Sequence, residues 1–259
     1  MQLFIELFGK QIPSYGLMIV IGVVLGNLIA FAVLHYSRLD LNDFFVIEAY
    51  TFLGAFIGAK LLYLIVSFNE IQWGRLFELQ YFNELMLGGF VFYGGLIGGL
   101  IFALCAGKFH KIDSKLYMKR LIFLIPFIHA FGRIGCYMAG CCYGIPYDGF
   151  GAVVFPEGSL APSGIPLFPV QLVEAILLFI IAAFLGYMSI RKNWDYSIES
   201  YLILYSIVRF ILEFYRYDEV RGFVLGLTTS QWISIAILIV SILVIIKKRV
   251  EKKKLESEE

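Results

Sequence analysis

Charged residues are scarce in this chain. Only 16% of its 259 residues are Asp, Glu, Lys or Arg, whereas 60% are hydrophobic, and the mean hydropathy is +0.82. An average soluble domain carries about 25% charged residues, so this composition is far from that of a soluble protein. The formal net charge of +1 says nothing further about partners, and we expect no nucleic acid among them.

Several patterns with a known meaning are also missing. No polar–apolar alternation of period two is seen, which argues against a membrane β-barrel. The chain has no internal repeat and no Walker, Rossmann or metalloprotease motif, and we expect no cofactor. Its start lacks the basic region and cleavage site of a signal peptide, so the first apolar run is expected to remain as a membrane span.

What the chain has instead is a series of long apolar runs, several of which approach or exceed the ~20 residues that a membrane-crossing helix needs. We predict an all-α integral membrane protein, one polytopic domain over residues 1–259. About seven transmembrane helices are expected, at residues 15–34, 44–66, 86–106, 121–138, 169–190, 198–214 and 228–246. Residues 1–14 are amphipathic and are expected to lie at the membrane interface.

Lysine and arginine fall mainly in one set of connections between these runs. That set holds Arg38, Lys108, Lys111, Lys115, Lys119, Arg120, Arg191, Lys192 and the tail 247–259. The alternate set holds only Lys10, Arg75, Arg216 and Arg221. The positive-inside rule then places the N-terminus outside, the tail in the cytoplasm and the loop 139–168 on the outer face.

Two arginines interrupt the apolar runs: Arg133 in PFIHAFGRIGCYMAGCCYG and Arg209 in YLILYSIVRFILEFYR. A cation at membrane depth costs at least about 2.5 kcal/mol and persists where it has a partner, water or a ligand. The planar guanidinium group fits phosphate and carboxylate particularly well. The two arginines therefore predict a site for an anionic group, which in a membrane protein we expect to be a lipid phosphate.

Other polar side chains accompany these arginines. Tyr205, Arg209, Glu213 and Arg216 are spaced by four, four and three residues, which stacks them on one face of a helix. They either serve the phosphate site or form a buried ion-pair ladder that holds helices together. Glu174 is either a partner for an arginine or a lone structural acid.

The segment GRIGCYMAGCCYG resembles the signature of the prolipoprotein diacylglyceryl transferase family, a Gly-Arg-x-Gly core that ends in glycine. Six other segments resemble family motifs in the same order along the chain. They are SYGLMIVIG, GAFIGAKLLYLI, GGFVFYGGLIGG, FPVQLVEA, YSIVRFILEFYR and GLTTSQWISI. The resemblance therefore covers the whole chain.

This resemblance implies a multi-pass enzyme of the bacterial cytoplasmic membrane, with its active site towards the outer leaflet. It would transfer the diacylglyceryl group of phosphatidylglycerol to the lipobox cysteine of a prolipoprotein, the first step of lipoprotein maturation. The expected catalytic residues are Arg133, Arg209 and Tyr93. The residues expected to bind the lipid phosphate and headgroup are Arg133, Tyr15, Lys60, Gly94, Gly95, Tyr205, Glu213, Arg216 and Glu174.

The chain departs from the family pattern at several positions. Tyr93 stands where the family usually has histidine, and Cys136, Ala139 and Cys141 replace the usual Asn, Asn and Glu. Tyr93 either positions a substrate, is deprotonated near basic groups, or packs between helices. Two alternatives stay open: a family relative that uses the same lipid on a different acceptor, and a transporter or binder of an anionic lipid or solute.

Cys136, Cys141 and Cys142 form a C-x4-C-C pattern near the outer face. This is not a standard zinc spacing, and we expect no metal. A disulfide between Cys136 and one of the other two, a redox or acyl-carrying thiol, and simple packing of small residues are the alternatives. Glycine stripes, such as Gly22-x3-Gly26 and Gly54-x3-Gly58, predict close helix contacts.

Overall fold

The computed structural model describes residues 3–7, 9–217 and 222–258; Arg221 of the connection preceding the last helix lies outside them. The chain divides into two compact units, residues 1–33 with 119–259 and residues 34–118. Each unit is described by itself.

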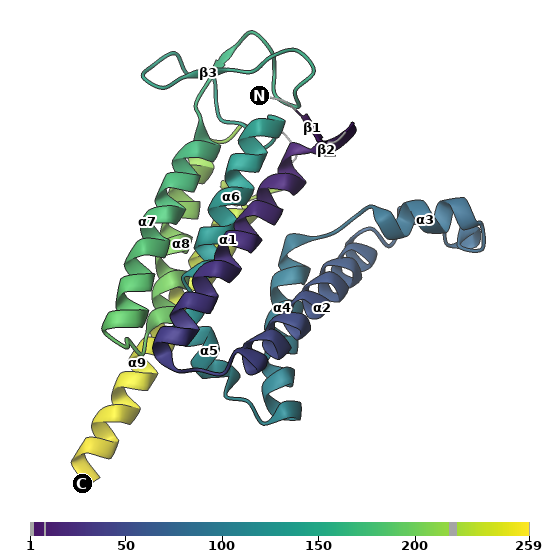
Figure 1. Ribbon diagram of the computed structural model, residues 1–259. Coiled ribbons are helices and arrows are strands. Elements are labelled where there is room, and N and C mark those ends of the chain that lie inside the picture. The colour runs from purple at the N-terminus through teal and green to yellow at the C-terminus, as the bar shows by residue number, and fades with distance from the viewer. Residues whose placement is uncertain (1–2, 8, 218–221, 259) are drawn as a thin grey trace. The chain divides into compact units, whose positions relative to one another are not determined.

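The first unit is a bundle of long helices that run side by side (Figure 1). They are α1 (Ser14–Ser37, within this unit as far as residue 33), α6 (Leu124–Ala139), α7 (Val170–Arg191), α8 (Ser197–Leu212) and α9 (Thr229–Glu258). Small residues allow close approach: a Cβ on Gly22 would lie 2.8 Å from the Cβ of Phe131, which confirms this glycine stripe as a packing surface. Ala130, Ala175 and Leu178 form a buried cluster between α6 and α7.

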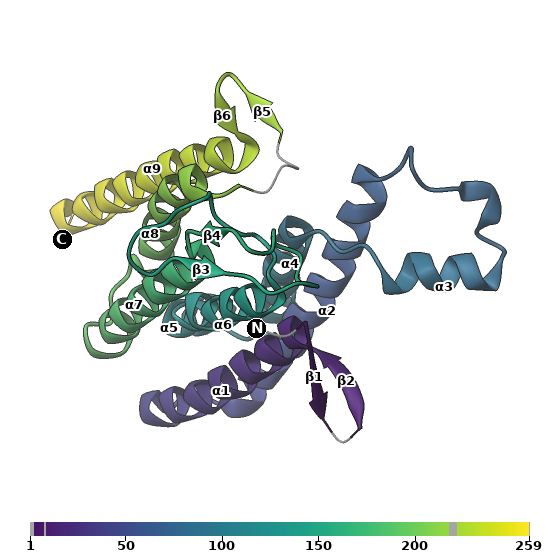
Figure 2. The same ribbon diagram turned by 90° about the horizontal axis from the view of Figure 1, so that it is seen from above.

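Short antiparallel hairpins cover the ends of these helices. β1 (Phe4–Leu7) pairs with β2 (Lys10–Pro13), β3 (Val153–Val154) with β4 (Pro166–Leu167), and β5 (Phe223–Val224) with β6 (Leu227–Thr228). Figures 1 and 2 show β3 and β4 over the ends of α6, α7 and α8, at the end of the bundle where β1 and β2 also lie. The C-terminal end of α9 lies at the opposite end (Figure 1).

The loop 139–168 has a small core of its own. Phe155, Ala161 and Leu167 are buried together, and three partly buried side chains pack against them. Ser159 ties the turn together by donating its hydroxyl hydrogen to the Pro156 carbonyl at 2.9 Å. The loop is therefore a folded cap on this end of the bundle.

The second unit contains α2 (Leu41–Val66), the short helix η1 (Trp73–Arg75), α3 (Leu79–Leu87), α4 (Phe92–His110) and the start of α5 (Ser114–Leu121). α2 and α4 contact through glycine: a Cβ on Gly58 would lie 2.9 Å from the Cα of Gly98. The predicted packing role of Gly54 and Gly58 is therefore confirmed.

Every predicted span contains a helix, but not every helix is long enough to cross a membrane. Among the described residues, five helices qualify by length and composition: α1, α2, most of α4, α7 and α9. The bent pair α5 and α6, with an angle of 52° between them, raises the count to six. α8 has only 16 residues. A multi-pass, mainly helical membrane protein is therefore supported.

Two predicted boundaries need correction. The third run was expected to be helical from residue 86, but residues 86–87 end α3 and the next helix begins at Phe92. Gly88 and Gly89 separate the two helices, and Gly89 has a positive φ of 66° that side chains rarely tolerate. The last helix does not stop at residue 246, because α9 continues through the charged tail to Glu258.

Candidate functional site

An ion pair between α6 and α7 is the centre of the site. Arg133 Nη2 lies 2.9 Å from Glu174 Oε1, and the Glu174 side chain is only 1% exposed. Ala130 on α6 and Ala175 on α7 are both buried beside this pair, so the two helices approach closely. Of the two alternatives for Glu174, the structure has the arginine partner.

Arg209 joins this pair to the end of α8. Its Nη2 lies 3.0 Å from Glu213 Oε2, and its Nη1 lies 3.9 Å from Glu174 Oε2. The same Nη2 donates a hydrogen bond to Ser230 Oγ of α9 at 3.2 Å. Arg216 lies 4.0 Å from Glu213, so three guanidinium groups meet two carboxylates and leave one net positive charge. We call these five residues the Arg–Glu network.

Two N–H groups of the network are buried without a hydrogen-bond acceptor among the described residues. They are Arg133 Nε and Arg209 Nη1. An unpaired buried donor costs about 1–3 kcal/mol, and more when it is charged. A net positive charge with two unsatisfied donors is the arrangement that an anionic ligand would complete.

Aromatic side chains border the network. The Tyr205 hydroxyl donates to Glu174 Oε1 at 3.3 Å, and the Tyr205 ring meets His129 edge to face with centroids 5.3 Å apart. Tyr15, on the first turn of α1, packs its backbone against α6: its Cα would lie 3.0 Å from a Cβ on Gly135. Its side chain is 45% exposed, so it is accessible near this end of the bundle.

Two glycines of the signature segment have opposite surroundings. A Cβ on Gly132, beside Arg133, would meet nothing within 4 Å. A Cβ on Gly144 would lie 2.9 Å from the Tyr215 carbonyl oxygen and would overlap that of Phe168. Gly144 also forms a β-bridge with Arg216, so its close packing fixes the backbone that carries this arginine.

Four predicted site residues belong to the second unit. Lys60 is buried and donates hydrogen bonds to the carbonyls of Leu85 and Gly88, at the end of α3. Gly94 packs against α2, because a Cβ there would lie 2.6 Å from that of Leu62. Gly95 faces the same helix: a Cβ there would lie 3.3 Å from the Ala55 carbonyl oxygen and 3.5 Å from the Ala59 Cβ.

Tyr93 lies in the first turn of α4 and is 37% exposed. The structure thus joins Tyr205 to the five residues of the Arg–Glu network, with Tyr15 on the same bundle. It explains Lys60 and Gly94 by contacts within their own unit.

Comparison with known proteins decides the family. The family model described as prolipoprotein diacylglyceryl transferase matches residues 2–247. The chain belongs to this family.

Three relatives are similar to this chain over most of its length and of their own. This prolipoprotein diacylglyceryl transferase family member is 36% identical over 240 residues to a phosphatidylglycerol–prolipoprotein diacylglyceryl transferase 2 of Clostridium perfringens, covering 92% of this chain and 91% of the relative. A similarly named protein of Clostridium tetani is 34% identical, covering 92% and 94%. One from Campylobacter jejuni is 29% identical over 256 residues, covering 93% and 91%.

In this family member, α6 ends in a Schellman motif. The amide of Gly140 donates to the Tyr137 carbonyl at 3.2 Å, and the amide of Cys141 donates to the Cys136 carbonyl at 3.0 Å. Gly140 has the positive φ, 72°, that this motif requires. The motif places the first residue after the glycine against the last turn of the helix, which brings Cys141 beside Cys136.

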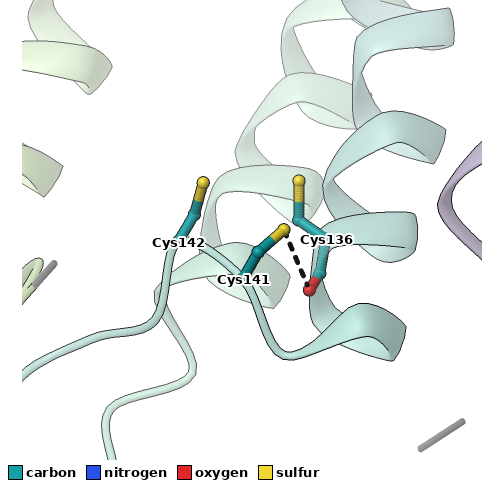
Figure 3. Close-up of side chains that lie close together, drawn as sticks. All are labelled: Cys136, Cys141 and Cys142. Atoms are coloured by element: carbon teal, nitrogen blue, oxygen red, sulfur yellow. Dashed lines mark hydrogen bonds between the residues drawn. The ribbon is translucent and has the colours of Figure 1, made fainter. Parts of the chain in front are cut away.

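A second left-handed residue adds the third thiol. Cys142 has φ 55°, which is uncommon for a residue other than glycine. The Sγ atoms of Cys136, Cys141 and Cys142 all lie within 4.8 Å of one another (Figure 3), and we call them the thiol cluster. The neighbouring Cys136 and Cys141 thiols lower the pKa of Cys142, and the charges of Arg216 and Arg133 also lower it, although burial opposes them.

The four cysteines lie within the described residues, and all are free thiols. The disulfide considered for Cys136 is therefore not formed in this structure. The spacing that argued against a metal site does not prevent the three sulfur atoms from meeting, because the turn after α6 folds back on the helix.

Sequence reasoning did not single out two side chains that support the site. Ser230 contacts Arg209, and Gln171 donates from Nε2 to the Cys141 carbonyl at 2.9 Å. Both belong to segments already quoted as family motifs, FPVQLVEA and GLTTSQWISI. The second motif has a further reason: Thr228 and Gln231 bond to each other's backbone amides and cap the start of α9.

Proposed function

We propose that this protein transfers the diacylglyceryl group of phosphatidylglycerol to the lipobox cysteine of a prolipoprotein. The relatives bear the name of that activity. The observation that carries the proposal is the buried Arg–Glu network, whose net positive charge and unpaired donors on Arg133 and Arg209 suit a lipid phosphate.

The reaction joins a thiolate to a glycerol carbon. The acceptor thiol first loses its proton to solvent, the sulfur then forms a C–S bond, and the C–O bond to the phosphate breaks with its electron pair on oxygen. Glycerol phosphate leaves with the added negative charge. Arg133 Nε and Arg209 Nη1 donate to phosphate oxygens, where that charge grows, and Glu174 holds both arginines in place.

The remaining predicted residues have supporting roles in this proposal. Tyr205 and Glu213 orient the network, and Arg216 adds positive charge beside Gly144. Binding roles for Tyr15, Lys60, Tyr93, Gly94 and Gly95 stay predictions. For Tyr93 we propose that it positions a substrate, since a phenol has an ordinary pKa of about 10 and is a poor base near neutral pH.

The proposed topology has seven spans, the N-terminus outside and the C-terminus in the cytoplasm of a bacterial cell. α8 counts as a span although it has only 16 residues, because Glu213–Tyr215 of η2 extend it. The first unit then has five spans and the second has two. The positions of β1–β2 and of the C-terminal end of α9, at opposite ends of the bundle, support the odd number (Figure 1). The network then faces the outer leaflet of the cytoplasmic membrane.

The test is transfer by the purified protein in phosphatidylglycerol bilayers. A lipobox peptide is added, and both the mass of the peptide and the release of glycerol phosphate are measured. We expect the wild type to lipidate the peptide and Arg133→Ala to lose about 10²–10³-fold in rate, the usual effect of removing one donor to a developing negative charge. Arg75→Ala is the matched control, because Arg75 forms an exposed pair with Glu78 on the second unit.

Lipid binding without turnover, by a protein that stays folded, would contradict the transferase proposal. It would favour the transporter or lipid-binding alternative.

A further inference from the structure

Among the residues that the structure describes, the thiol cluster is the most concentrated set of reactive side chains outside the Arg–Glu network. Cys136 is the residue three from the end of α6, and Cys141 and Cys142 follow the Schellman turn. Figure 3 shows the sulfur atoms of Cys136 and Cys142 on the same side as that of Cys141, close to the helix end. Consecutive residues usually direct their side chains apart, so the left-handed backbone of Cys142 is what adds the third sulfur.

The spacing of the sulfur atoms fits one metal ion. Zinc–sulfur bonds of about 2.3 Å in a tetrahedral site place the ligand sulfurs about 3.8 Å apart. The three Sγ atoms here lie within 4.8 Å of one another, so small side-chain rotations suffice to close the site. Three thiolate ligands favour zinc or another soft cation over magnesium or calcium.

Only three protein ligands are present in this cluster among the described residues. Structural zinc sites are normally closed by four protein ligands, whereas sites with three leave one position for a substrate or water. Gln171 anchors the turn from the other side by its bond to the Cys141 carbonyl, so the loop that carries two of the ligands is fixed to α7. The geometry therefore suits a zinc site with one free coordination position, on a loop that is hydrogen-bonded to α7.

We propose that Cys136, Cys141 and Cys142 bind Zn²⁺ and that the thiol of the acceptor cysteine takes the open coordination position. This inference rests on the proposed function, because it names how that reaction obtains its nucleophile. A thiol coordinated to zinc is deprotonated outright, and its proton passes to solvent. No electron transfer is involved: the zinc-bound sulfur attacks the glycerol carbon, and glycerol phosphate leaves.

The position of the thiol cluster relative to Arg133 supports this role. Cys136 follows Arg133 by three residues on α6, which places the two side chains on one face about 5–6 Å apart at their Cβ atoms. That spacing is suitable for a sulfur on zinc to reach a carbon whose phosphate is held by Arg133. Within the network both carboxylates are engaged by guanidinium groups, so neither is available to take the thiol proton.

The charges of the two groups are complementary. Three thiolates around Zn²⁺ have a net charge of about −1. The adjacent Arg–Glu network has one net positive charge. The negative metal site is therefore stabilised by the network before lipid binds.

The first experiment measures metal in the full-length protein. The protein is purified in detergent without chelator, equilibrated with Zn²⁺, freed of excess metal and analysed by mass spectrometry of its metal content. We expect one zinc per chain in the wild type and in Cys105→Ser, whose cysteine lies on α4 of the second unit. Cys136→Ser and Cys141→Ser are expected to lose the zinc. Cys142→His, which retains a zinc ligand, is expected to keep it and serves as the folded control.

The second experiment tests the open position with Co²⁺ in place of zinc. Sulfur-to-cobalt absorption bands should appear in the wild type and change when a lipobox peptide is added. A peptide with serine in place of its cysteine should leave them unchanged. Removing the metal with a chelator should abolish transfer, and adding Zn²⁺ should restore it.

The outcomes separate this inference from the proposed function. Full transfer by metal-free protein, a disulfide within the cluster of the active enzyme, or bound copper without zinc would overturn the zinc role and leave the transferase intact. Cysteine-dependent zinc binding with no spectral change on adding the peptide would overturn the acceptor role. Zinc and peptide binding with no transfer from phosphatidylglycerol would instead overturn the proposed function.

Discussion

At the residue scale, Glu174 is the group on which the Arg–Glu network depends. It is almost fully buried and is shared by Arg133 and Arg209, while Tyr205 donates to it. Removing one member of a buried ion pair is costly, because the charge that remains has lost its compensation. The carboxylate therefore allows two arginines to remain within an apolar bundle.

Replacing Glu174 by glutamine tests this role. Glu174→Gln keeps the shape but leaves three guanidinium groups of the network with one carboxylate, so we expect a loss of about 3 kcal/mol in the free energy of unfolding. Thermal or denaturant unfolding of the purified protein measures it. Glu157→Gln, in the exposed part of the loop 139–168, should change stability by less than about 0.5 kcal/mol. Equal stability of both variants would show that the pair contributes little.

Gly132→Ala tests whether the lipid headgroup reaches Arg133 over this glycine, because the change should not disturb helix packing. Space is open around Gly132, and alanine is about 1 kcal/mol better than glycine within a helix, so the unfolding temperature should hold or rise. If a headgroup approaches Arg133 over this glycine, the added methyl group should lower the transfer rate by about tenfold. Rates measured at several phosphatidylglycerol contents test this; an unchanged rate at every content would mean that the lipid approaches Arg133 from another side.

Gly144→Ala should behave in the opposite way. The backbone must move because the new Cβ meets two carbonyl oxygens, and the β-bridge to Arg216 moves with it. We expect a loss of about 1–3 kcal/mol in stability together with lower transfer. Thermal unfolding and the peptide assay measure the two effects, and normal stability would argue against this account of the glycine.

At the element scale, turns and caps place the chemistry. The Schellman motif at Gly140 gathers the thiols, and the capping box of Thr228 and Gln231 starts α9 where Ser230 meets Arg209. These are local devices whose residues are readable in the sequence. What they bring together depends on the helices packed next to them.

The packing of α2 against α4 is the main helix–helix contact described in the second unit. Gly58→Ala would place a Cβ 2.9 Å from the Cα of Gly98, so the two helices must separate. We expect a loss of about 1–3 kcal/mol, measured by thermal unfolding in detergent. Gly74→Ala, in η1 of the same unit, meets open space and should be neutral. A neutral Gly58→Ala would mean that the helices tolerate a wider spacing.

At the scale of the whole molecule, the topology can be tested directly. The basic residues Lys247, Lys248 and Arg249, which follow the apolar part of α9, predict a cytoplasmic C-terminus. A C-terminal fluorescent protein that matures only in the cytoplasm should be bright, and a C-terminal alkaline phosphatase should be inactive. The reverse result would invert the membrane orientation and place the network at the inner leaflet.

The sequence by itself determined the membrane class, the helical runs, the family and most members of the network. Hydropathy, lysine and arginine placement and short motifs are local properties, and for that reason Arg133, Arg209 and Glu213 could be named in advance. The spacing of Tyr205, Arg209, Glu213 and Arg216 predicted one helical face for all four, which is wrong for Arg216, because the regular helix ends at Leu212 and the Arg216 backbone is extended.

Only the tertiary structure decided which of these residues meet. The partner of Arg133 comes from another helix 41 residues later, and its choice depends on how closely α6 and α7 pack. The ammonium group of Lys60 donates to the carbonyls of Leu85 and Gly88 at the end of α3, and no local pattern of the sequence indicates these partners. The three thiols, spaced in a way that argued against a metal, meet because backbone conformation and not sequence spacing fixes the distances between sulfur atoms.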